Sequence, residues 1–312
     1  MSNTIVLSVA LNATPGAPLK GCLNDSRNFL GAVKNRLGKA DVFTLYDKGA
    51  TLAAYRDLLL NHIIPATYAS PAGLLVEHNS SHGTQVPVGI AAPDEPDAYD
   101  EARVFYDYRS GGLLIDDEER ALMSLINPHW KVRQIKDNCH SGSSLRGFFG
   151  FAPHFVNRVH PRQRARVLPT AQIPRATLTA VAEWLEPPLQ REPTTRLYQQ
   201  LRTATTVVEA RLLAKQLYSA LTKNKFKGVV DHPDRLLLAA CQASQTCADA
   251  YINNSYQGAH TWAMLKAWGE MPGETYQQIR QRTATLLKGS YDQLPQLEMT
   301  NPAAETLPFL RG

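Results

Sequence analysis

Cysteine is scarce in this chain of 312 residues. The four cysteines are too few and too scattered for a disulfide framework, and none lies in a CxxC pair that is matched by a second pair, as a structural zinc site usually requires. Reduced thiols are therefore expected. The four are Cys22, Cys139, Cys241 and Cys247.

Long apolar runs are also missing. No stretch approaches the roughly 18 uninterrupted apolar residues that a membrane helix needs, and the N-terminal segment lacks the basic start and the long apolar core of a signal peptide. The hydrophobic content of 44% and the charged content of 20% are those of a globular protein that can bury a core. We expect a cytoplasmic protein that has no membrane partner.

The excess of one charge sign is small. The chain carries 33 Lys and Arg residues against 28 Asp and Glu residues, a net charge of +5, and it has no long basic block. Nucleic acid is therefore not the expected partner. A short basic run that contains Arg162, Arg164 and Arg166 leaves two interpretations open at this point, contact with phosphate and an exposed surface strip.

Short apolar runs alternate with amphipathic segments in the first part of the chain, a pattern typical of strands joined by crossover helices over a largely parallel sheet. We expect the polar stretch 84–112 to be a loop, and Asn24 or Asp25 to cap the first helix. The pattern loosens after residue 143, and regular elements return near residue 233. Strands are expected at 4–11, 41–47, 73–81, 130–138, 235–241 and 295–300, and helices at 26–38, 52–64, 116–127, 206–224, 244–254, 258–268 and 275–289.

Two segments rich in small residues follow apolar strands directly, HNSSHGT around His82 and DNCHSGS around Cys139. A thiol nucleophile needs a partner that takes its proton, and small neighbours let a substrate carbonyl approach backbone N–H groups. Reactive groups in open α/β sheets gather beyond the carboxyl ends of the strands, so the two residues are expected to meet. The alternative interpretation is a buried core cysteine and a loop histidine.

These segments resemble the metacaspase family of caspase-like cysteine peptidases, type I-like and without a long prodomain. The resemblance rests on LKGCLNDSRNF near the first helix, SSHGTQVP around His82, the acidic DAYDEARVFYDYRSGGLLIDDEE, DNCHSG around Cys139, and the C-terminal LLLAACQASQTCADAYINNSYQGAHTWAMLKAW and DQLPQLEMT. It implies an α/β fold, a caspase-like α/β/α sandwich with a mostly parallel central sheet of about six strands. Residues 1–142 would be the large-subunit-like catalytic region, 143–232 a long linker or insertion, and 233–312 a small-subunit-like region that completes the same domain.

The resemblance also implies roles for single residues. Cys139 would attack the scissile carbonyl, His82 would protonate the leaving amine, and the N–H groups of Gly83 and Cys139 would form the oxyanion hole. A second set, Asp25, Ser80 and Asp137, matches the positions that line the specificity pocket. Two carboxylates in a partly desolvated pocket favour a cationic side chain, so cleavage after Arg or Lys is expected. A helix cap remains the alternative for Asp25, and a satisfied strand-end acid for Asp137.

Calcium is a further implication of the resemblance, with Asp97, Asp116 and Asp117 as the oxygen ligands. The chain departs from the family pattern at two places. It has 143–146 (Ser-Ser-Leu-Arg) where a further acidic ligand is expected, and Ala243 and Ser244 where the family commonly has acids. A solvated helix N-terminus is the alternative for the Asp116–Asp117 pair.

The predicted function is therefore a cysteine endopeptidase that acts on proteins or peptides after Arg or Lys, with calcium activation and self-processing as further expectations. The arginines at 162, 164 and 166 and the lysines at 223, 225 and 227 are candidate self-cleavage sites. We expect a monomer, because a metacaspase sheet edge is commonly blocked. The alternative is a catalytically weak caspase-like scaffold or interaction module.

Overall fold

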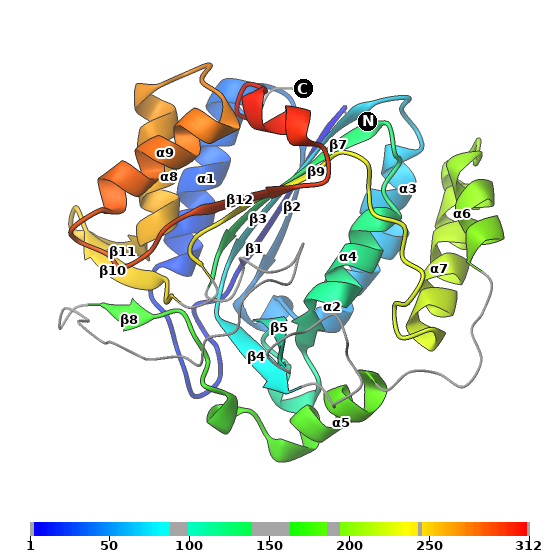
Figure 1. Ribbon diagram of the computed structural model, residues 1–312, viewed down its shortest axis with the longest axis horizontal. Coiled ribbons are helices and arrows are strands. Elements are labelled where there is room, and N and C mark those ends of the chain that lie inside the picture. The colour runs from blue at the N-terminus through cyan, green and yellow to red at the C-terminus, as the bar shows by residue number, and fades with distance from the viewer. Residues whose placement is uncertain (1–2, 88–98, 139–162, 186–193, 243–244, 311–312) are drawn as a thin grey trace.

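The computed structural model describes residues 3–87, 99–138, 163–185, 194–242 and 245–310, and these form three layers. A six-stranded sheet is the middle layer, and helices cover both of its faces (Figure 1). The prediction of an α/β/α sandwich with a mostly parallel sheet of about six strands is confirmed.

The strand order of the central sheet is β12-β9-β7-β3-β1-β2. All neighbours run parallel except β12, which pairs antiparallel with β9 at one edge. Because β7, β3 and β1 are parallel neighbours in the middle, their carboxyl ends lie together at one end of the sheet, where reactive groups gather in such folds. The strands are β1 (Thr4–Ala10), β2 (Asp41–Tyr46), β3 (Gly73–Ser80), β7 (Trp130–Asp137), β9 (Arg235–Ala239) and β12 (Gln296–Met299).

Side chains of β1 alternate between the two faces of the sheet, as the two-residue period of a strand requires. Ile5, Leu7 and Val9 belong to the apolar core on one face, and Val6 belongs to the core on the other. A strand that is buried on both faces is apolar almost throughout, which is why its sequence, TIVLSVA, carries a strong strand signal.

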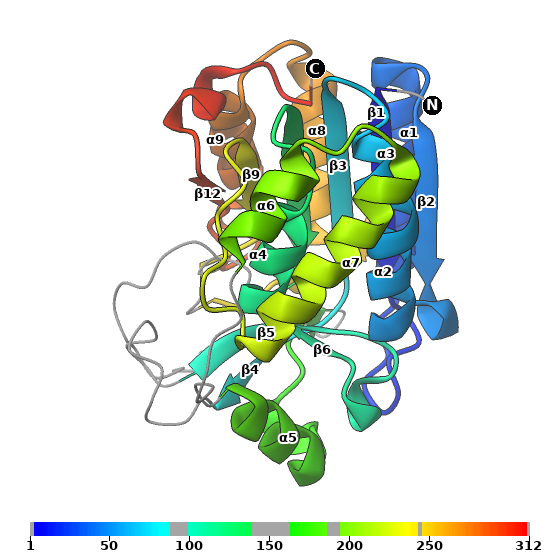
Figure 2. The same ribbon diagram turned by 90° about the vertical axis from the view of Figure 1, so that its right-hand side faces the viewer.

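Helices of two groups sandwich the sheet (Figure 1). One face carries α1, α8 and α9, and the other carries α2, α3 and α4, with α7 packed outside α3 and α4 and next to α6 (Figure 2). The helices are α1 (Cys22–Leu37), α2 (Leu52–Leu58), which continues through a π-helical turn at Leu59–Ile63 into α3 (Ile64–Thr67), α4 (Asp116–Ser124), α5 (Arg175–Leu185), α6 (Thr195–Arg202), α7 (Val207–Lys223), α8 (Ala259–Glu270) and α9 (Tyr276–Leu287). Within the described ranges, none of these helices has both the length and the apolar character needed to cross a membrane.

Two small antiparallel sheets lie beyond the carboxyl end of the central sheet, at the lower side of Figure 1. One has the order β4-β5-β6 and the other the order β11-β10-β8. Their strands are β4 (Gly83–Pro87), β5 (Tyr99–Val104), β6 (Leu113–Ile115), β8 (Arg164–Ala165), β10 (Ala248–Ile252) and β11 (Ser255–Gly258).

The prediction of a loop at 84–112 is wrong for the part that is described, because β4 and β5 pair there and β6, directly after it, joins their sheet. Ala102 and Val104 of β5 enter the core, but the alternating positions are charged. One of these, Arg103, is itself buried and donates to the Glu77 carboxylate at 2.7 Å. The strand was not predicted because charged residues alternate with its apolar ones. The ion-pair partner that allows Arg103 to be buried lies on the distant strand β3, so no local pattern indicates it.

Two further predictions of local structure are wrong. The expected helix at 244–254 is, in its described part, mainly strand β10, which turns at Asn253 and Asn254 (φ of 50° and 63°) and pairs with β11. An Asn-Asn pair with positive φ is typical of a tight hairpin. The first helix begins at Cys22 with Gly21 before it and no side-chain cap, so Asp25 does not cap it.

Two buried histidines are held neutral by the fold. His78 of β3 stacks on Phe29 with ring centroids 4.5 Å apart, and His260 lies on α8. Burial lowers the pKa of His78 to about 3 and the pKa of His260 to about 4, while Asp137 opposes both shifts. The unfolded residue titrates near pH 6.5, so the unfolded chain binds protons between about pH 6.5 and 4 that the native state does not bind.

The folded state should therefore lose about 1.4 kcal/mol of stability per pH unit and per histidine as the pH falls through this window. Urea unfolding of wild type and His260→Gln at several pH values measures this loss. The free energy of unfolding of the variant should fall less steeply with pH than that of wild type. The variant must be compared with wild type because the raised pKa of Asp25 makes the folded state more stable as the pH falls, which is opposite to the effect of the histidines. His129→Gln is the matched control, since His129 is exposed, and its slope should equal that of wild type. Equal slopes for His260→Gln and wild type would contradict the prediction.

Candidate active site

The carboxyl ends of β3 and β7 are in register, since Ser80 pairs with Asp137. His82 follows β3 by two residues, and Asn138 follows β7 directly. The chain then continues into Cys139, which lies outside the described residues. Both strands thus end at the same edge of the sheet, as the sequence led us to expect for parallel neighbours. Whether Cys139 meets His82 there stays a prediction.

The ring of His82 has a defined orientation. Its Nε2 lies 2.7 Å from the carbonyl oxygen of Ala17. A carbonyl only accepts, so Nε2 carries the hydrogen and Nδ1 is the basic nitrogen of the neutral ring. The side chain borders a pocket of about 590 Å³ whose walls come from the loop at 16–19 and from the segment 164–172. A histidine fixed in one tautomer at the wall of a pocket can exchange a proton with a group in that pocket.

The described thiols differ from an active nucleophile. Cys22, Cys241 and Cys247 are all fully buried, and burial raises the pKa of Cys22 far above its usual range. A thiol in such a place stays protonated and out of reach of a peptide. The pair Cys241 and Cys247 packs with Ala240, so packing is the role that the structure supports for it.

Three predicted pocket residues lie close together. Asp25 of α1, Ser80 of β3 and Asp137 of β7 are fully buried, and Ser80 Oγ donates to Asp25 Oδ2 at 2.7 Å. Backbone groups orient the two carboxylates: Gly258 N donates to Asp25 Oδ1 at 2.8 Å, and Thr261 N donates to Asp137 Oδ2 at 2.7 Å. The structure therefore brings the three residues together, and their part in substrate binding stays a prediction.

A fourth pocket residue was missed by the sequence analysis. Asp249 of β10 is fully buried, and its carboxylate accepts from Lys20 N at 2.8 Å and from Gly21 N at 2.9 Å. A side chain at Gly21 would collide with this carboxylate, so glycine is required there for the close approach. The Asn-Asn turn after β10 was the available signal, because a hairpin assignment would have placed alternate residues of ADAYI on the buried face.

The acidic pocket formed by Asp25, Asp137 and Asp249 is filled by a side chain of the same chain, Arg166. Its guanidinium is fully buried, and Nη2 lies 2.7 Å from Asp25 Oδ2 and 3.1 Å from Asp249 Oδ1. On the other side, Nη1 donates to Ser80 Oγ at 2.6 Å and to the Asp137 carbonyl at 3.0 Å, with Asp137 Oδ1 at 3.4 Å. The exposed surface strip expected for 162–166 is therefore wrong at this residue. Arg164 is exposed, and Arg162 lies outside the described residues.

The charges in the pocket control one another. Burial raises the pKa of Asp25 to about 7, although the Arg166 guanidinium pulls it down. Burial also disfavours the charged form of Asp137, but Arg166 outweighs it and holds the pKa of Asp137 below its usual range. The pKa of Arg166 is raised far above its usual range against the cost of burial, chiefly by Asp137. The carboxylates thus stabilise the buried positive charge of Arg166.

The backbone of Arg166 is held at the place predicted for an oxyanion. Its carbonyl oxygen accepts a hydrogen bond from the N–H of Gly83 at 3.0 Å, and its own N–H donates to the Cys247 carbonyl at 2.9 Å. Gly83 O in turn accepts from Leu168 N at 2.9 Å. The N–H group predicted as an oxyanion donor therefore already binds the carbonyl of an arginine.

The predicted calcium ligands are only partly described. Asp116 and Asp117 form the first turn of α4, whereas Asp97 lies outside the described residues. The Asp117 carboxylate pairs with Arg120 at 3.0 Å and with Lys227 at 3.8 Å. In the described part of the chain, no group of three or more His, Cys, Asp or Glu residues is arranged to hold a metal ion. Calcium binding stays a prediction.

Comparison with known proteins points to one family. Residues 5–147 match the family model "Metacaspase, peptidase C14 domain", a segment that contains both the His82 and the Cys139 motifs. The chain is therefore similar to the metacaspase family. It is 25% identical over 304 residues to Metacaspase-1 of Meyerozyma guilliermondii, covering 94% of this chain and 68% of that protein. It is 27% identical over 299 residues to Metacaspase-1 of Mycosarcoma maydis, with 94% and 69% covered.

Metacaspases of this family are cysteine peptidases, so the prediction of a cysteine endopeptidase is confirmed at that level. A crystal structure of protein GSU0716 from Geobacter sulfurreducens matches the fold with a TM-score of 0.59 and 22% identity, covering 98% of this chain and 97% of that one. At that identity, the likeness supports the fold of this chain and nothing further.

Proposed function

We propose that this chain hydrolyses peptide bonds that follow Arg or Lys, with Cys139 as the nucleophile and His82 as the acid and base. One observation carries the proposal: an arginine, Arg166, occupies the predicted specificity pocket while its carbonyl rests on the N–H of Gly83. A substrate arginine in the same pose would present its carbonyl carbon to a nucleophile at the strand end after β7.

The proposed chemistry uses a thiol and an imidazole in turn. His82 accepts the proton of the Cys139 thiol, and the thiolate attacks the carbonyl carbon. The N–H groups of Gly83 and Cys139 hold the oxyanion of the tetrahedral intermediate. His82 then protonates the amine nitrogen, the C–N bond breaks, and a thioester remains. A water molecule, deprotonated by His82, attacks the thioester and releases the carboxylic acid and the thiol.

Specificity follows from the pocket charge. A guanidinium fits the carboxylates of Asp25, Asp137 and Asp249, and an ammonium satisfies fewer of these contacts, so Arg should exceed Lys. An aspartate side chain would be repelled, and a neutral one would leave buried carboxylates without a counter-charge. Rejection of such side chains is worth about 100-fold or more, because polar groups of the site stay unpaired.

A peptide panel tests this proposal. The peptides differ only in the residue before the scissile bond, which is Arg, Lys, citrulline, norleucine or Asp. Citrulline is the matched control, since it keeps the shape of arginine without its charge. We expect kcat/KM for Arg to exceed the value for citrulline at least about 100-fold. Similar turnover of the Arg and citrulline peptides would contradict a specificity based on charge.

The proposal extends to self-processing in the chain between β7 and β9, to activation by calcium through Asp97, Asp116 and Asp117, and to a monomer that acts in the cytoplasm. The panel should be run once with calcium and once with a chelator. The rates then report the peptidase activity, and the difference between the two sets reports its dependence on calcium. Equal rates in the two arms would remove calcium from the proposal and leave the peptidase in place.

A further inference from the structure

The loop between β1 and α1 carries the carbonyl group that orients His82. The two sides of this loop are held together, because Leu19 N donates to Asn12 O at 2.9 Å. Its start is also fixed from outside, since the Asp47 carboxylate accepts from Asn12 N at 2.7 Å and from Ala13 N at 2.8 Å. The loop is therefore closed and anchored at its base, and its tip reaches the ring of the histidine.

The tip of the loop is a tight turn of four residues, Thr14, Pro15, Gly16 and Ala17. Ala17 N donates to Thr14 O at 3.1 Å, and Gly16 has a φ of 80°. Proline at the second position and glycine with positive φ at the third are typical of a type II turn. Types I and II differ in the orientation of the central peptide unit, which here contains the Pro15 carbonyl. A contact to that carbonyl therefore favours one form of the turn over the other.

Two neighbouring side chains hold the Pro15 carbonyl. Tyr108 Oη donates to it at 2.7 Å, and Arg109 Nη2 donates to it at 3.3 Å. Arg109 Nε also donates to Tyr108 Oη at 3.2 Å, so the arginine helps to direct the hydroxyl group. Tyr108 is buried, and a side chain at Gly16 would come within 2.6 Å of Arg109 Nη2, so glycine leaves room for this contact. The turn thus rests on a Tyr-Arg pair from a distant part of the chain.

We propose that Tyr108 and Arg109 are positioning residues that hold His82 in its working tautomer and orientation. They act through the 14–17 turn, whose last carbonyl accepts the hydrogen of Nε2 at 2.7 Å. This rests on the proposed function, in which Nδ1 takes a proton from the thiol of Cys139 and gives it to the leaving amine. Nε2 keeps its own hydrogen throughout, so one ring nitrogen does the proton transfer while the other is held in place.

The size of the effect follows from the tautomer. If the turn changes form, the Ala17 carbonyl no longer fixes the hydrogen on Nε2, and the hydrogen can move to Nδ1. A catalytic histidine in the wrong tautomer costs an acyl-transfer enzyme about 10⁴-fold in kcat. For histidines that bind metals, loss of the group that orients the ring costs roughly 10- to 100-fold in activity. The smaller scale applies to Tyr108, because Arg109 still contacts the turn when the hydroxyl is removed.

The first test compares Tyr108→Phe with Tyr68→Phe on a short peptide that has Arg before the scissile bond. Tyr68 is the matched control, because its hydroxyl also donates to a main-chain carbonyl, that of Leu125, at 3.2 Å. It precedes β3, whereas His82 follows that strand. We expect Tyr108→Phe to lower kcat roughly 10- to 100-fold and to leave KM unchanged, since the acidic pocket is intact. Tyr68→Phe should match wild type in both constants.

The second test does not need turnover. Nitrogen-15 spectra of the imidazole rings report which ring nitrogen carries the hydrogen, and they are recorded at mildly alkaline pH in the Cys139→Ala background. The signals of His82 are identified by their loss in His82→Gln. We expect hydrogen on Nε2 alone in the Cys139→Ala protein and in its combination with Tyr68→Phe. The combination with Tyr108→Phe should show a mixture of the two tautomers.

A second route to the same turn guards against a general loss of fold in Tyr108→Phe. Gly16→Ala places a side chain at positive φ and against Arg109 Nη2, so it disturbs the turn without changing Tyr108. It should reproduce the fall in kcat at unchanged KM and the mixture of tautomers. Gly289→Ala is its matched control, because Gly289 has a similar φ of 86° in open space after α9. That variant should keep wild-type kcat.

The outcomes separate this inference from the proposed function. If wild type hydrolyses the Arg peptide and Tyr108→Phe keeps its kcat, the positioning role is overturned and the peptidase stands. If no protein hydrolyses the peptide but Tyr108→Phe alone of the two tyrosine variants changes the tautomer of His82, the positioning role stands and the proposed function falls. An equal fall in kcat for Tyr68→Phe, or a fall in Tyr108→Phe with unchanged ring signals, also overturns the positioning role.

Discussion

Cys139→Ala should lower kcat/KM on Arg peptides by at least about 10⁴-fold, the scale seen when a nucleophile of an acyl-transfer enzyme is removed. In the proposed mechanism the sulfur of Cys139 forms the bond to the substrate carbonyl, and alanine has no atom that can do so. His82→Ala should cause a loss of similar size, because the two residues act as a unit and their effects do not add. Turnover with the release of a coloured amine measures both.

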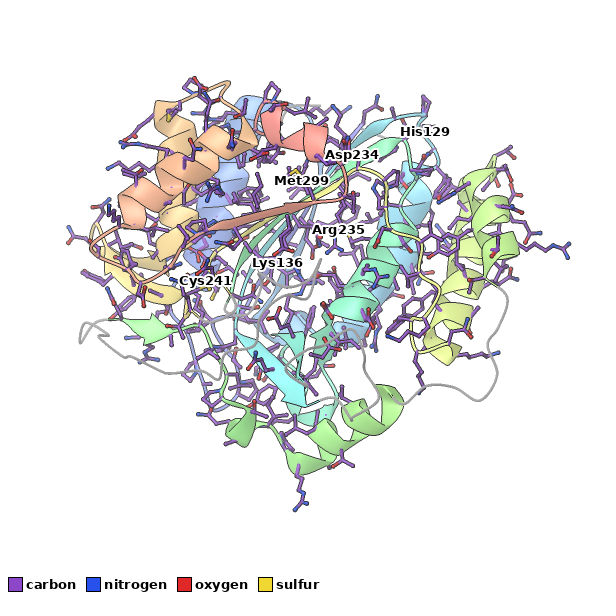
Figure 3. The ribbon with its side chains drawn as sticks, in the orientation of Figure 1. His129, Lys136, Asp234, Arg235, Cys241 and Met299 are labelled. Atoms are coloured by element: carbon purple, nitrogen blue, oxygen red, sulfur yellow. The ribbon has the colours of Figure 1, made fainter. Side chains whose placement is uncertain are left out.

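Two controls accompany these variants. Cys241→Ala removes a different buried thiol, and His129→Ala removes an exposed histidine at the far end of the sheet from Cys241 (Figure 3). Both should keep wild-type kcat/KM. Circular dichroism should show the native fold in all four proteins. Activity that persists in folded Cys139→Ala would remove this residue as the nucleophile, and the described thiols are too deeply buried to replace it.

Glu119→Ala should be the most destabilising single change in the buried charge network, with a loss of about 3–5 kcal/mol. Glu119 of α4 lies in the protein interior, where its carboxylate pairs with Lys136 and lies 3.5 Å from Arg103 and 3.7 Å from Arg235. Figure 3 shows Lys136 and Arg235 in the middle of the molecule, on neighbouring strands β7 and β9. Without the carboxylate, three buried cations repel one another.

The same network predicts a second sensitivity to acid. Burial disfavours the charged form of Glu119, but Lys136, Arg103 and Arg235 outweigh it and lower its pKa to about 2. A carboxyl with a depressed folded-state pKa contributes stability above its unfolded pKa of about 4.3, and this contribution is lost as the pH falls from there to about 2.

Urea unfolding near neutral pH measures the loss in Glu119→Ala. The matched control is Glu270→Ala, whose carboxylate forms an ion pair with Arg282 at 2.8 Å on the surface, where the two side chains are 39% and 38% exposed. That change should cost at most about 1 kcal/mol, since exposed ion pairs are weak. Equal losses in the two variants would mean that the interior charges are screened as if by water, and the network would then not stabilise the fold.

The strands with long apolar runs were predictable because burial on both faces of the sheet requires apolar residues at nearly every position. β1, β3 and β7 are buried on both faces and read as near-continuous apolar segments ending in polar residues. The helices at Val207–Lys223 and Tyr276–Leu287 were equally clear from their period. In contrast, β5 escaped prediction because Glu101 and Arg103 interrupt its apolar pattern, and Arg103 is satisfied by Glu77, a residue far away in the chain.

The candidate site divides in the same way. Ser80 and Asp137 end strands, His82 lies just beyond one, and Asp25 lies in the first turn of a helix. Local pattern and family resemblance could therefore locate all four. Asp249 depended on recognising a hairpin that was taken for a helix. Arg166 carried no local signal beyond its charge, and a basic residue in a proline-rich stretch is usually solvated.

By itself, the sequence determined the layered α/β architecture, the arrival of His82 and of the strand that leads to Cys139 at one edge of the sheet, and the similarity to a family of cysteine peptidases. Only the tertiary structure decided that the acidic pocket has a third carboxylate and that the chain's own Arg166 fills it. The physical reason is range: periodicity records whether each residue faces the core or the solvent, whereas an ion pair between α1, β10 and a distant basic segment depends on how the folded chain brings them together.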